Sequence, residues 1–348
     1  MIYLYTAPTN EFDHSKGYFH PLLEYLALES RTVTSIYELK NDLADADFAV
    51  LPLAIEYFKS AKQKEYLDSF ISKAVQNEKP MLLFSTGDFG TSRRDSLIYT
   101  LRLGGFHSQM DSRTEIMPPF FLDPLLFLNK EFKIVSKTKQ PNIGFVGHAN
   151  GGVVKLVKEF ILFVKGNGLR FIGKDNTDYQ KFYPSSYYRN VYLKIIQKNK
   201  EIVTDFIFRK KYRAGVVTEA DRQRTSIAFY NNIFENQYVF CLRGTGNFSV
   251  RFYETLALGR IPVLINTDCR LPFNSKINWT RHCLIIQEGE EHTIAEKIIE
   301  FHNSFTDAQF EEMQRSNREL WENHFTKEKY FVEYAKVVQE QIVNTRND

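Results

Sequence analysis

The feature that most constrains the fold is the run of residues 238–265, YVFCLRGTGNFSVRFYETLALGRIPVLI. An apolar run is followed by a glycine-rich loop, an amphipathic segment that ends at Gly259, and a second apolar run. This order predicts a strand, a loop, a helix and a second strand, and two strands joined by a helix lie parallel. Parallel sheets are covered by helices on both faces, so the chain is predicted to be an α/β protein.

The same alternation of short apolar runs and amphipathic segments occurs on both sides of residue 140. Before it, we expect strands at residues 2–5, 48–53 and 81–84 and helices at 21–28 and 62–76. After it, we expect strands at 143–146, 238–242, 261–265 and 282–286 and helices at 153–164, 194–208, 221–235 and 249–258, while 175–192 has no readable periodicity. A length of 348 residues suits two such domains.

Composition excludes several classes of protein. Hydrophobic residues make up 43% and charged residues 25% of the chain, which excludes a disordered protein. The net charge of +3 gives no reason to expect a nucleic-acid partner. The N-terminus has no basic segment and no window reaches the length of a membrane span, so we expect no signal peptide, no anchor and a cytoplasmic protein. Cys241, Cys269 and Cys283 lack metal-ligand spacing and are expected to be reduced thiols.

The glycine-rich loop and the predicted helix after it form a candidate anion site. Gly244 and Gly246 permit tight turns and close approach of the backbone to a ligand. Ser249 is a good N-cap residue, and the free N–H groups of a first helical turn attract anions. Arg243 and Arg251 flank this turn and could bind phosphate oxygens. Glu254, on the same side of the helix as Arg251, would suit ribose hydroxyls, so the pattern favours a nucleotide diphosphate site over a surface Arg251–Glu254 pair.

Residues 238–265 closely resemble the signature of exostosin-like glycosyltransferases, and the resemblance continues through residues 271–273, 277–279 and 320–322. Two fainter matches lie outside this block. The Gly87-Asp88-Phe89-Gly90 turn is similar to the His-Asp-Trp-Gly element of the family's N-terminal half, although Gly87 departs from it at the first position. Residues 142–147 are similar to the strand and glycine turn that open the family's second domain.

The resemblance implies a GT-B architecture, in which two Rossmann-like domains face each other across a cleft. On this basis we expect an acceptor-side domain at residues 1–140, a nucleotide-sugar domain at 141–326, and a final helix at 327–348 that packs back toward the first domain. The resemblance also implies an inverting transfer from a sugar nucleotide, most often UDP-linked, to a hydroxyl of a glycan acceptor. We expect no further cofactor and no metal, because arginines and a helix N-terminus can stabilise the leaving diphosphate.

A base must take the proton of the acceptor hydroxyl on the face opposite the leaving group. Asp88 is the first candidate, because it follows a buried strand at the carboxyl end where ligands of open α/β sheets bind. Asp13 and His14, in the loop after the first strand, and His148 are further candidates. Each of them could instead be a turn-capping or solvated residue.

Other residues are expected at the donor site, with alternatives. Gly147 and His148 lie in a turn that could bring backbone amides to the donor, or that could simply join a strand to a helix. Arg209, Lys210 and Arg213 could contact phosphate or end a solvated helix. The tyrosines of residues 179–192 could stack on an acceptor sugar or pack in the core. The donor set is Arg243, Gly244, Gly246, Asn247, Ser249, Arg251, Glu254, Gly147, His148, Arg209 and Arg213.

Two rival functions remain open from the sequence. One is a non-catalytic sugar-nucleotide-binding partner subunit, which would lack a base facing the donor pocket. The other is a sugar-nucleotide hydrolase or epimerase on the same fold, which would need two acid/base groups beside the sugar ring. Asp45 and Asp47 mimic an Asp-x-Asp metal motif, but they precede a predicted strand, so we expect no metal there. The oligomeric state cannot be inferred from one chain.

Overall fold

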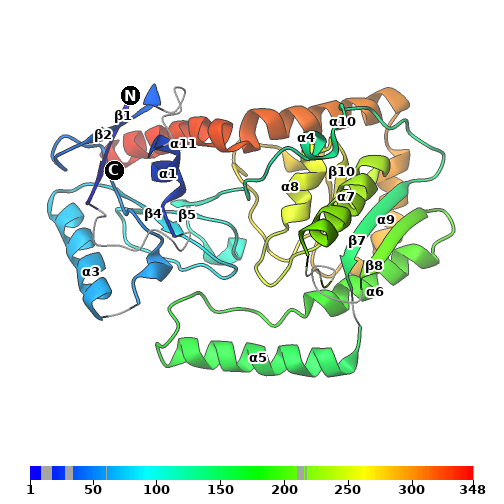
Figure 1. Cartoon of the computed structure of the whole chain (residues 1–348), viewed down its shortest axis with the longest axis horizontal. Coiled ribbons are helices and arrows are strands. Elements are labelled where there is room, and N and C mark those ends of the chain that lie inside the picture. The colour runs from blue at the N-terminus through cyan, green and yellow to red at the C-terminus, as the bar shows by residue number, and fades with distance from the viewer. Residues whose placement is uncertain are drawn as a thin grey trace.

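The chain folds into two α/β bodies joined by long helices (Figure 1). The computed structural model describes residues 1–8, 18–27, 34–59, 61–149, 151–209, 215 and 218–347. Within these residues there are two sheets, and each strand pair in them is parallel. The predicted α/β fold with two Rossmann-like domains of parallel strands, the architecture of GT-B proteins, is therefore confirmed.

The first sheet has the strand order β2-β1-β3-β4-β5-β6. Its strands are β1 (Ile2–Thr6), β2 (Tyr37–Lys40), β3 (Phe48–Val50), β4 (Met81–Ser85), β5 (Ile98–Arg102) and β6 (Thr114–Ile116). Helices α1 (Pro21–Ala27) and α3 (Ala61–Gln76) connect its early strands. The central strands β3, β4 and β5 are buried along their whole length, as the continuous apolar runs predict.

The second sheet has the order β11-β10-β9-β7-β8. Its strands are β7 (Asn142–His148), β8 (Val203–Arg209), β9 (Tyr238–Cys241), β10 (Ile261–Ile265) and β11 (Leu284–Ile286). The accompanying helices are α5 (Val153–Phe171), α6 (Ser185–Lys198), α7 (Glu219–Glu235), α8 (Val250–Ala257) and α9 (Ile294–Asn303). The predicted unit of strand, loop, helix and strand at residues 238–265 is thus confirmed as β9-α8-β10.

The prediction of one helix over residues 194–208 is wrong. Helix α6 begins earlier, at Ser185, within the stretch whose periodicity was unreadable, and Asn199 caps its C-terminus. Residues 203–209 form the edge strand β8, with alternating half-buried and exposed side chains over most of its length. The sequence VTDFIFR is rich in β-branched and aromatic residues, which suits a strand. The aliphatic residues before it have helical spacing, so the sequence did not show where the helix ends and the strand begins.

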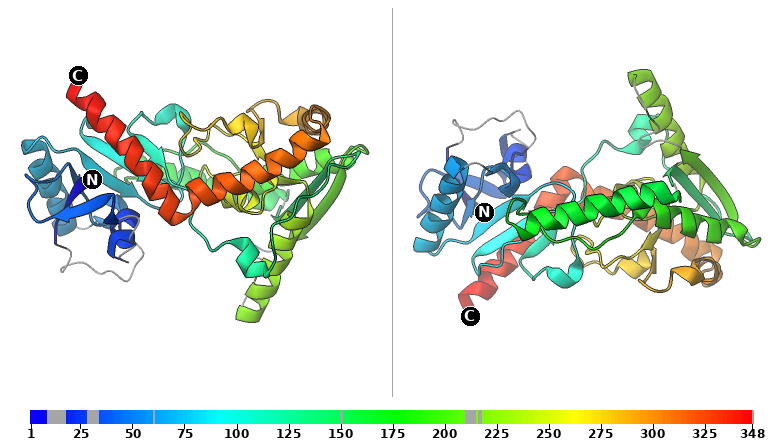
Figure 2. Two further views of the ribbon diagram at one scale, coloured as in Figure 1. Left: turned by 90° about the horizontal axis from the view of Figure 1, so that it is seen from above. Right: turned by 90° about the horizontal axis from the view of Figure 1, so that it is seen from below.

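The last helices connect the two bodies. Helix α10 (Asp307–Leu320) continues through a π-helical turn at Trp321–Phe325 into α11 (Lys327–Asn347), which reaches the first sheet (Figure 2). The hydroxyl of Tyr330 donates to the Ile116 carbonyl, and the hydroxyl of Tyr37 donates to the Phe331 carbonyl. One buried cluster contains apolar side chains from both sheets and from α11, so the two bodies share a core.

Two further observations concern the cysteines and the helices. Cys241 and Cys283 are buried, Cys269 is half-buried, and all three are free thiols, with burial raising the pKa of Cys241 to about 12. Among the helices in the described part of the chain, none is long and apolar enough to cross a membrane.

Candidate active site

The glycine-rich loop at residues 242–249 lies at the carboxyl end of β9 and leads into α8. Ser249 occupies the N-cap position of α8 in an extended conformation, as its sequence position predicts. Its hydroxyl, however, makes no capping hydrogen bond. The Phe252 N–H donates to the Ser249 carbonyl at 3.2 Å, but the Ser249 side chain caps no N–H group of the first turn, so a ligand could bind at this helix N-terminus.

Arg243 lies in the loop with only 4% of its surface exposed. One of its terminal nitrogens donates to the Thr245 carbonyl at 2.9 Å, and its guanidinium lies over the rings of Phe106 and Tyr183, 5.4 Å from each centroid. Burial lowers the pKa of Arg243 to about 10, against smaller opposing effects of Tyr183, Cys269 and Asp88. Its Nε is buried without a hydrogen-bond partner.

Arg251, on the first turn of α8, points toward the ends of the central strands. Its guanidinium donates to the Val146 carbonyl at 2.7 Å and to the Phe240 carbonyl at 3.4 Å, and it lies 4.4 Å from the centroid of the Phe145 ring. Its Nε is also buried and unpartnered, and burial lowers the pKa of Arg251. A Cβ added at Gly147 would lie 3.0 Å from the Arg251 guanidinium, so a glycine at the end of β7 leaves room for this arginine.

Two more arginines extend this positive region. Arg209, at the end of β8, donates to the Thr225 carbonyl at 2.6 Å. Arg189 of α6 was not predicted from the sequence; it donates to the His148 carbonyl at 2.8 Å and to the Arg243 carbonyl at 3.0 Å. Within the described residues, Arg209, Arg243 and Arg251 form no ion pair with a carboxylate. Their hydrogen bonds go to backbone carbonyls, so within the described residues no carboxylate in direct contact offsets their positive charge.

His148 ends β7 beside this region. Lys155 donates to its Nε2 at 2.8 Å, so Nε2 accepts, and we assign the ring proton to Nδ1. Burial, Lys155 and Arg189 together lower the pKa of His148, which keeps the ring neutral at pH 7. His148 and Arg209 line a groove of about 540 Å³ together with Ala149, Gly151, Asn190, Lys194 and Phe208.

Glu254 does not form the surface pair with Arg251 that was the alternative from the sequence. Its Oε1 accepts a hydrogen bond from the Tyr230 hydroxyl at 3.1 Å, and only 9% of the residue is exposed. Burial raises the pKa of Glu254 to about 7, although Arg251 and the bond from Tyr230 oppose this.

Asn247 was expected among the donor-binding residues, but the structure gives its side chain another use. Its amide nitrogen donates to the carbonyls of Gly105, Thr267 and Asp268, and its oxygen accepts from the Thr267 hydroxyl at 2.6 Å. Because these bonds occupy a fully buried side chain, the Asn247 amide joins the two bodies and holds the glycine-rich loop in place.

The Asp88 turn meets the glycine-rich loop. Asp88 is exposed and follows β4, and a Cβ added at Gly246 would overlap the Asp88 carbonyl oxygen. Gly87 and Gly90 have φ values of +83° and +67°, a region that favours glycine. The backbone of the Asp88 turn therefore lies directly against the glycine-rich loop. Gly244 has open space at its Cβ position.

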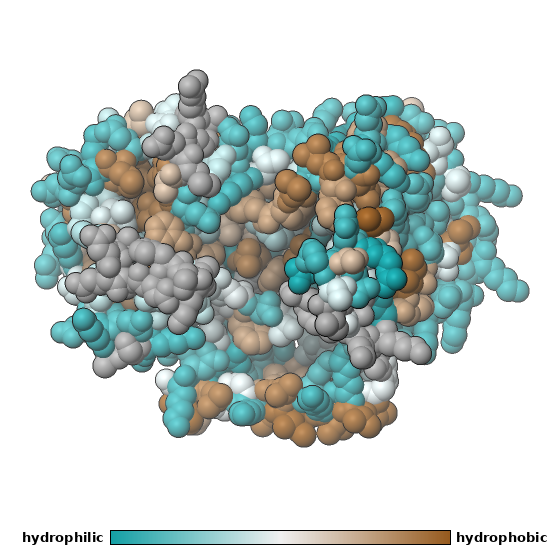
Figure 3. All heavy atoms as spheres, in the orientation of Figure 1, coloured by the Kyte–Doolittle hydropathy of each residue, from teal (hydrophilic) through white to brown (hydrophobic). Residues whose placement is uncertain are grey.

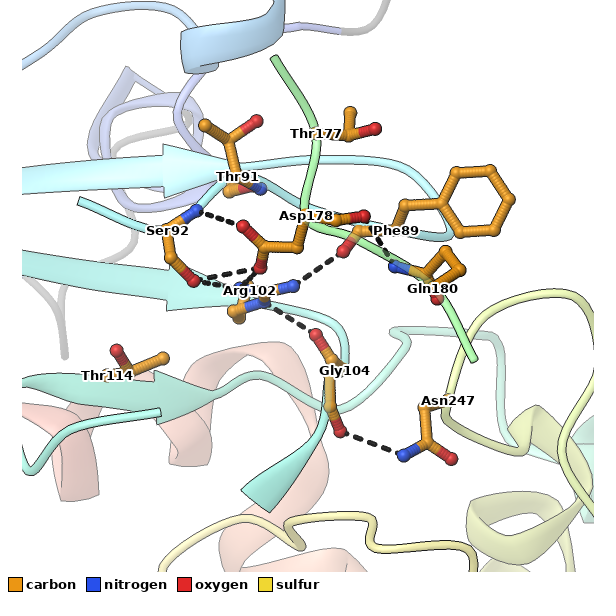
Figure 4. Close-up of polar contacts among 12 residues, drawn as sticks. Phe89, Thr91, Ser92, Arg102, Gly104, Thr114, Thr177, Asp178, Gln180 and Asn247 are labelled. Carbon is orange, nitrogen blue, oxygen red and sulfur yellow. Dashed lines mark hydrogen bonds and ion pairs between the residues drawn. The ribbon is translucent and has the colours of Figure 1, made fainter. Parts of the chain in front are cut away.

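Arg102 holds this turn in place and was not predicted from the sequence (Figure 4). Only 1% of it is exposed, and it donates to the carbonyls of Phe89 and Gly104 at 2.6 Å each. It also pairs with Asp178 at 2.7 Å, and Asp178 in turn accepts from Ser92. Asp178 belongs to the segment between α5 and α6, so this network also links the two bodies.

Several expected residues lie outside the site or outside the described residues. Asp13, His14, Lys210 and Arg213 are not among the described residues. Asp47 accepts a hydrogen bond from the Tyr3 backbone N–H, and no group of three or more His, Cys, Asp and Glu side chains able to hold a metal is found in the described ranges. Tyr183 and Tyr188 stack at 4.7 Å, and Tyr188 stacks on Tyr192, which is the packing alternative for these tyrosines.

The space between Arg243, Ser249 and Arg270 is small. A pocket of about 10 Å³ lies there, also lined by Phe248, Thr267 and Cys269, and it is no larger than one water molecule. The larger groove beside His148 is of the size that ligands occupy in proteins.

Comparisons with known proteins find only short or weak similarities. No family model matches the chain. An Exostosin-1 homolog of Caenorhabditis elegans is 30% identical over 95 residues, which are 27% of this chain and 24% of that protein. The chain thus matches about a quarter of this curated relative.

Solved structures resemble the chain only weakly. A glycosyltransferase from Rickettsia africae is 11% identical with a TM-score of 0.39, covering 98% of each chain. An α1,3-fucosyltransferase is 10% identical with a TM-score of 0.37, covering 98% of this chain and 90% of that one. Staphylococcus aureus TarM, in complex with UDP among other ligands, is 10% identical with a TM-score of 0.36, covering 85% and 55%. At these scores the likenesses carry no argument about fold or function.

Proposed function

We propose that the protein is an inverting glycosyltransferase that takes its sugar from a nucleoside diphosphate, with UDP as the expected nucleotide. The observation that carries the proposal is the group of guanidinium ions at the glycine-rich loop. Arg209, Arg243 and Arg251 form no ion pair with a carboxylate within the described residues, and two of them keep a buried Nε without a partner. Buried charge without a counter-ion is unfavourable, so a diphosphate ligand would supply what the fold lacks.

The groove beside His148 supports the same assignment. Arg209 lines it, and Arg189 links its wall to the glycine-rich loop by donating to both the His148 carbonyl and the Arg243 carbonyl. Its volume of about 540 Å³ lies within the range of small-molecule sites. The resemblance of residues 238–265 to exostosin-like enzymes, and the partial match to an Exostosin-1 homolog, support glycosyl transfer as the reaction.

The proposed reaction is a single displacement at the anomeric carbon. The acceptor hydroxyl attacks the sugar, its proton passes to a base, and the nucleoside diphosphate leaves with inversion. The arginines and the first turn of α8 stabilise the negative charge that develops on the diphosphate, in the role that a metal plays in other enzymes. We propose Asp88 as the base, since its turn lies against Gly246 and its carboxylate acts electrostatically on Arg243.

The test is thermal unfolding in the presence of UDP, GDP, CDP, dTDP and ADP, each with and without EDTA. A nucleotide at a hundred times its dissociation constant stabilises the protein by about 2.7 kcal/mol. We expect UDP to raise the melting temperature by several degrees, with no effect of EDTA. A shift that requires a divalent metal would refute the arginine mechanism, and no shift with any diphosphate would refute the nucleotide site.

Transfer itself is tested separately. The protein is incubated with a panel of UDP-sugars and glycan acceptors, and released UDP and glycosylated product are measured together. We expect UDP and product in equal amounts. UDP release without product, at a rate that acceptors do not change, would instead indicate a sugar-nucleotide hydrolase, and nucleotide binding with neither product would indicate a binding subunit.

A further inference from the structure

Helix α5 exposes an unusually large apolar surface. Val154 is 87% exposed, Phe171 is 82% exposed and Ile161 is 60% exposed. Val153, Val157, Phe160 and Val164 on the same helix are also exposed. At about 100° per residue, these seven side chains fall within an arc of about 120°, so they form one continuous stripe. Figure 3 shows apolar atoms along the lower edge of the molecule, where α5 lies in Figure 1.

One flank of α5, at the edge of the stripe where Phe160 lies, is already in contact with the protein. Phe160 and Phe163 pack against Phe182 with ring centroids 5.2 and 5.3 Å apart. Asn167 bonds the Gln180 backbone, and Arg170 bonds Thr177. The segment before α6 therefore holds α5 against the protein by these contacts. In the view from below, α5 lies nearest the viewer and crosses in front of the rest of the molecule (Figure 2).

Two exposed lysines, Lys158 and Lys165, border the apolar stripe. Helix α5 contains Lys155, Lys158, Lys165 and Arg170 against a single acidic residue, Glu159, which pairs with Lys155 at 3.6 Å. Lys158 and Lys165 lie about 20–40° beyond one edge of the apolar arc, so they face outward with it. Neither of them forms an ion pair within the part of the chain that the structure describes.

We propose that α5 docks on an anionic lipid bilayer, lying in the plane of the interface with its apolar stripe among the acyl chains. An apolar face bordered by lysines is the pattern of interfacial helices, in which burial of apolar area and attraction to anionic headgroups act together. A second copy of this chain fits less well. Pairing two α5 stripes would bring Lys158 and Lys165 of both copies to one seam, with only Glu159 available on each helix to offset them.

Docking in this way would place the candidate active site beside the membrane. Lys155, on the first turn of α5, donates to His148 at the groove described above. The docking proposal itself rests on α5 alone and does not depend on the proposed function.

The experiment is co-sedimentation of the full chain with vesicles of phosphatidylcholine, with and without phosphatidylglycerol. We expect binding to vesicles that contain phosphatidylglycerol, weakened by added salt. The double variant Val157→Asp/Ile161→Asp should bind about tenfold more weakly or worse, because each change places a charge in the apolar interface. The matched control is Leu122→Asp/Leu126→Asp, since each of these leucines is 71% exposed and lies away from α5.

A charge variant separates the contribution of the lysines to vesicle binding from the contribution of the apolar stripe. Lys158→Glu/Lys165→Glu should lose binding to phosphatidylglycerol vesicles while keeping its melting temperature, since both side chains are exposed. Equal binding to both kinds of vesicle, or no binding at low salt, would overturn the proposal. It would also be overturned if the wild type dimerises in solution and Val157→Asp/Ile161→Asp makes it monomeric.

Discussion

Replacing Arg243 by methionine tests whether its charge serves a ligand or the fold. Burial lowers the pKa of Arg243 well below its ordinary value, to about 10, which corresponds to about 3 kcal/mol of unfavourable free energy for the charged form. Few contacts offset this cost of burial. The hydrogen bond to the carbonyl of the exposed Thr245 contributes about 1 kcal/mol, and the two ring contacts together contribute about 1 kcal/mol. We therefore expect Arg243→Met to leave the stability of the unliganded protein unchanged, or to raise it by about 1 kcal/mol.

Arg260 is the matched control, because burial lowers its pKa to about 10 as well. Its guanidinium, however, donates to the carbonyls of Phe234, Lys133 and Gly259 and to Gln314, and none of its surface is exposed. Arg260→Met leaves these acceptors buried and unpaired, so it should lower stability by about 3 kcal/mol or more.

The assay is urea unfolding of the wild type and both variants, followed by calorimetric titration with UDP. Loss of a charged hydrogen bond to phosphate is worth about 1.5–3 kcal/mol, so Arg243→Met should weaken UDP binding roughly 10- to 150-fold. If Arg243→Met instead destabilises the protein as much as Arg260→Met does, the arginine is structural. Unchanged UDP affinity would equally refute its assignment to phosphate.

Three further predictions concern the contact between the bodies and the buried carboxylate. Asp88→Asn should reduce transfer by about a hundredfold or more while UDP affinity stays within a factor of about two; retained transfer would move the base elsewhere. Gly246→Ala should reduce transfer about tenfold by pushing the Asp88 turn away, whereas Gly244→Ala, which has open space, should not; equal rates would show that the backbone contact is dispensable. The pKa of Glu254 is raised from 4.5 to about 7, so its folded form retains a proton that the unfolded form loses, and wild-type stability falls with rising pH in this window. Glu254→Gln should therefore gain about 3 kcal/mol relative to wild type between pH 4.5 and pH 7 in parallel urea titrations, and a constant difference would contradict the buried acid.

Local patterns were sufficient to predict the elements that carry the candidate site. The glycines, the N-cap position of Ser249 and the apolar runs on either side lie within residues 238–265, and each depends on its near neighbours in sequence. The strand before Asp88 is likewise fixed by a short apolar run, so the carboxyl-end positions of Asp88 and Arg243 could be inferred.

The features that could not be predicted depend largely on contacts between distant segments. Asn247 was assigned to the donor from its place in the loop, but its partner Gly105 is 142 positions away. Arg102 and Arg189 were not predicted, because an arginine at a strand end or on a helix carries no signal of the carbonyls it will bond. The change from α6 to β8 was missed because residues between Lys194 and Phe208 combine helical spacing with β-branched and aromatic residues.

The interdomain contacts bear on how a substrate would reach the site. Asn247 joins the glycine-rich loop to Gly105, and the pair of Arg102 and Asp178 joins the Asp88 turn to the segment before α6. These two sets of bonds hold both sides of the contact between Asp88 and Gly246 in place. Most of these bonds involve fully or largely buried groups, and breaking them together to open the two bodies would leave buried polar atoms unpaired. The pocket at Arg243 is no larger than one water molecule, whereas the groove of about 540 Å³ beside His148 is open at Arg209, so a ligand could occupy the groove without breaking these bonds. Such a ligand would meet Arg209 at the end of β8, with the Asp88 turn already in place.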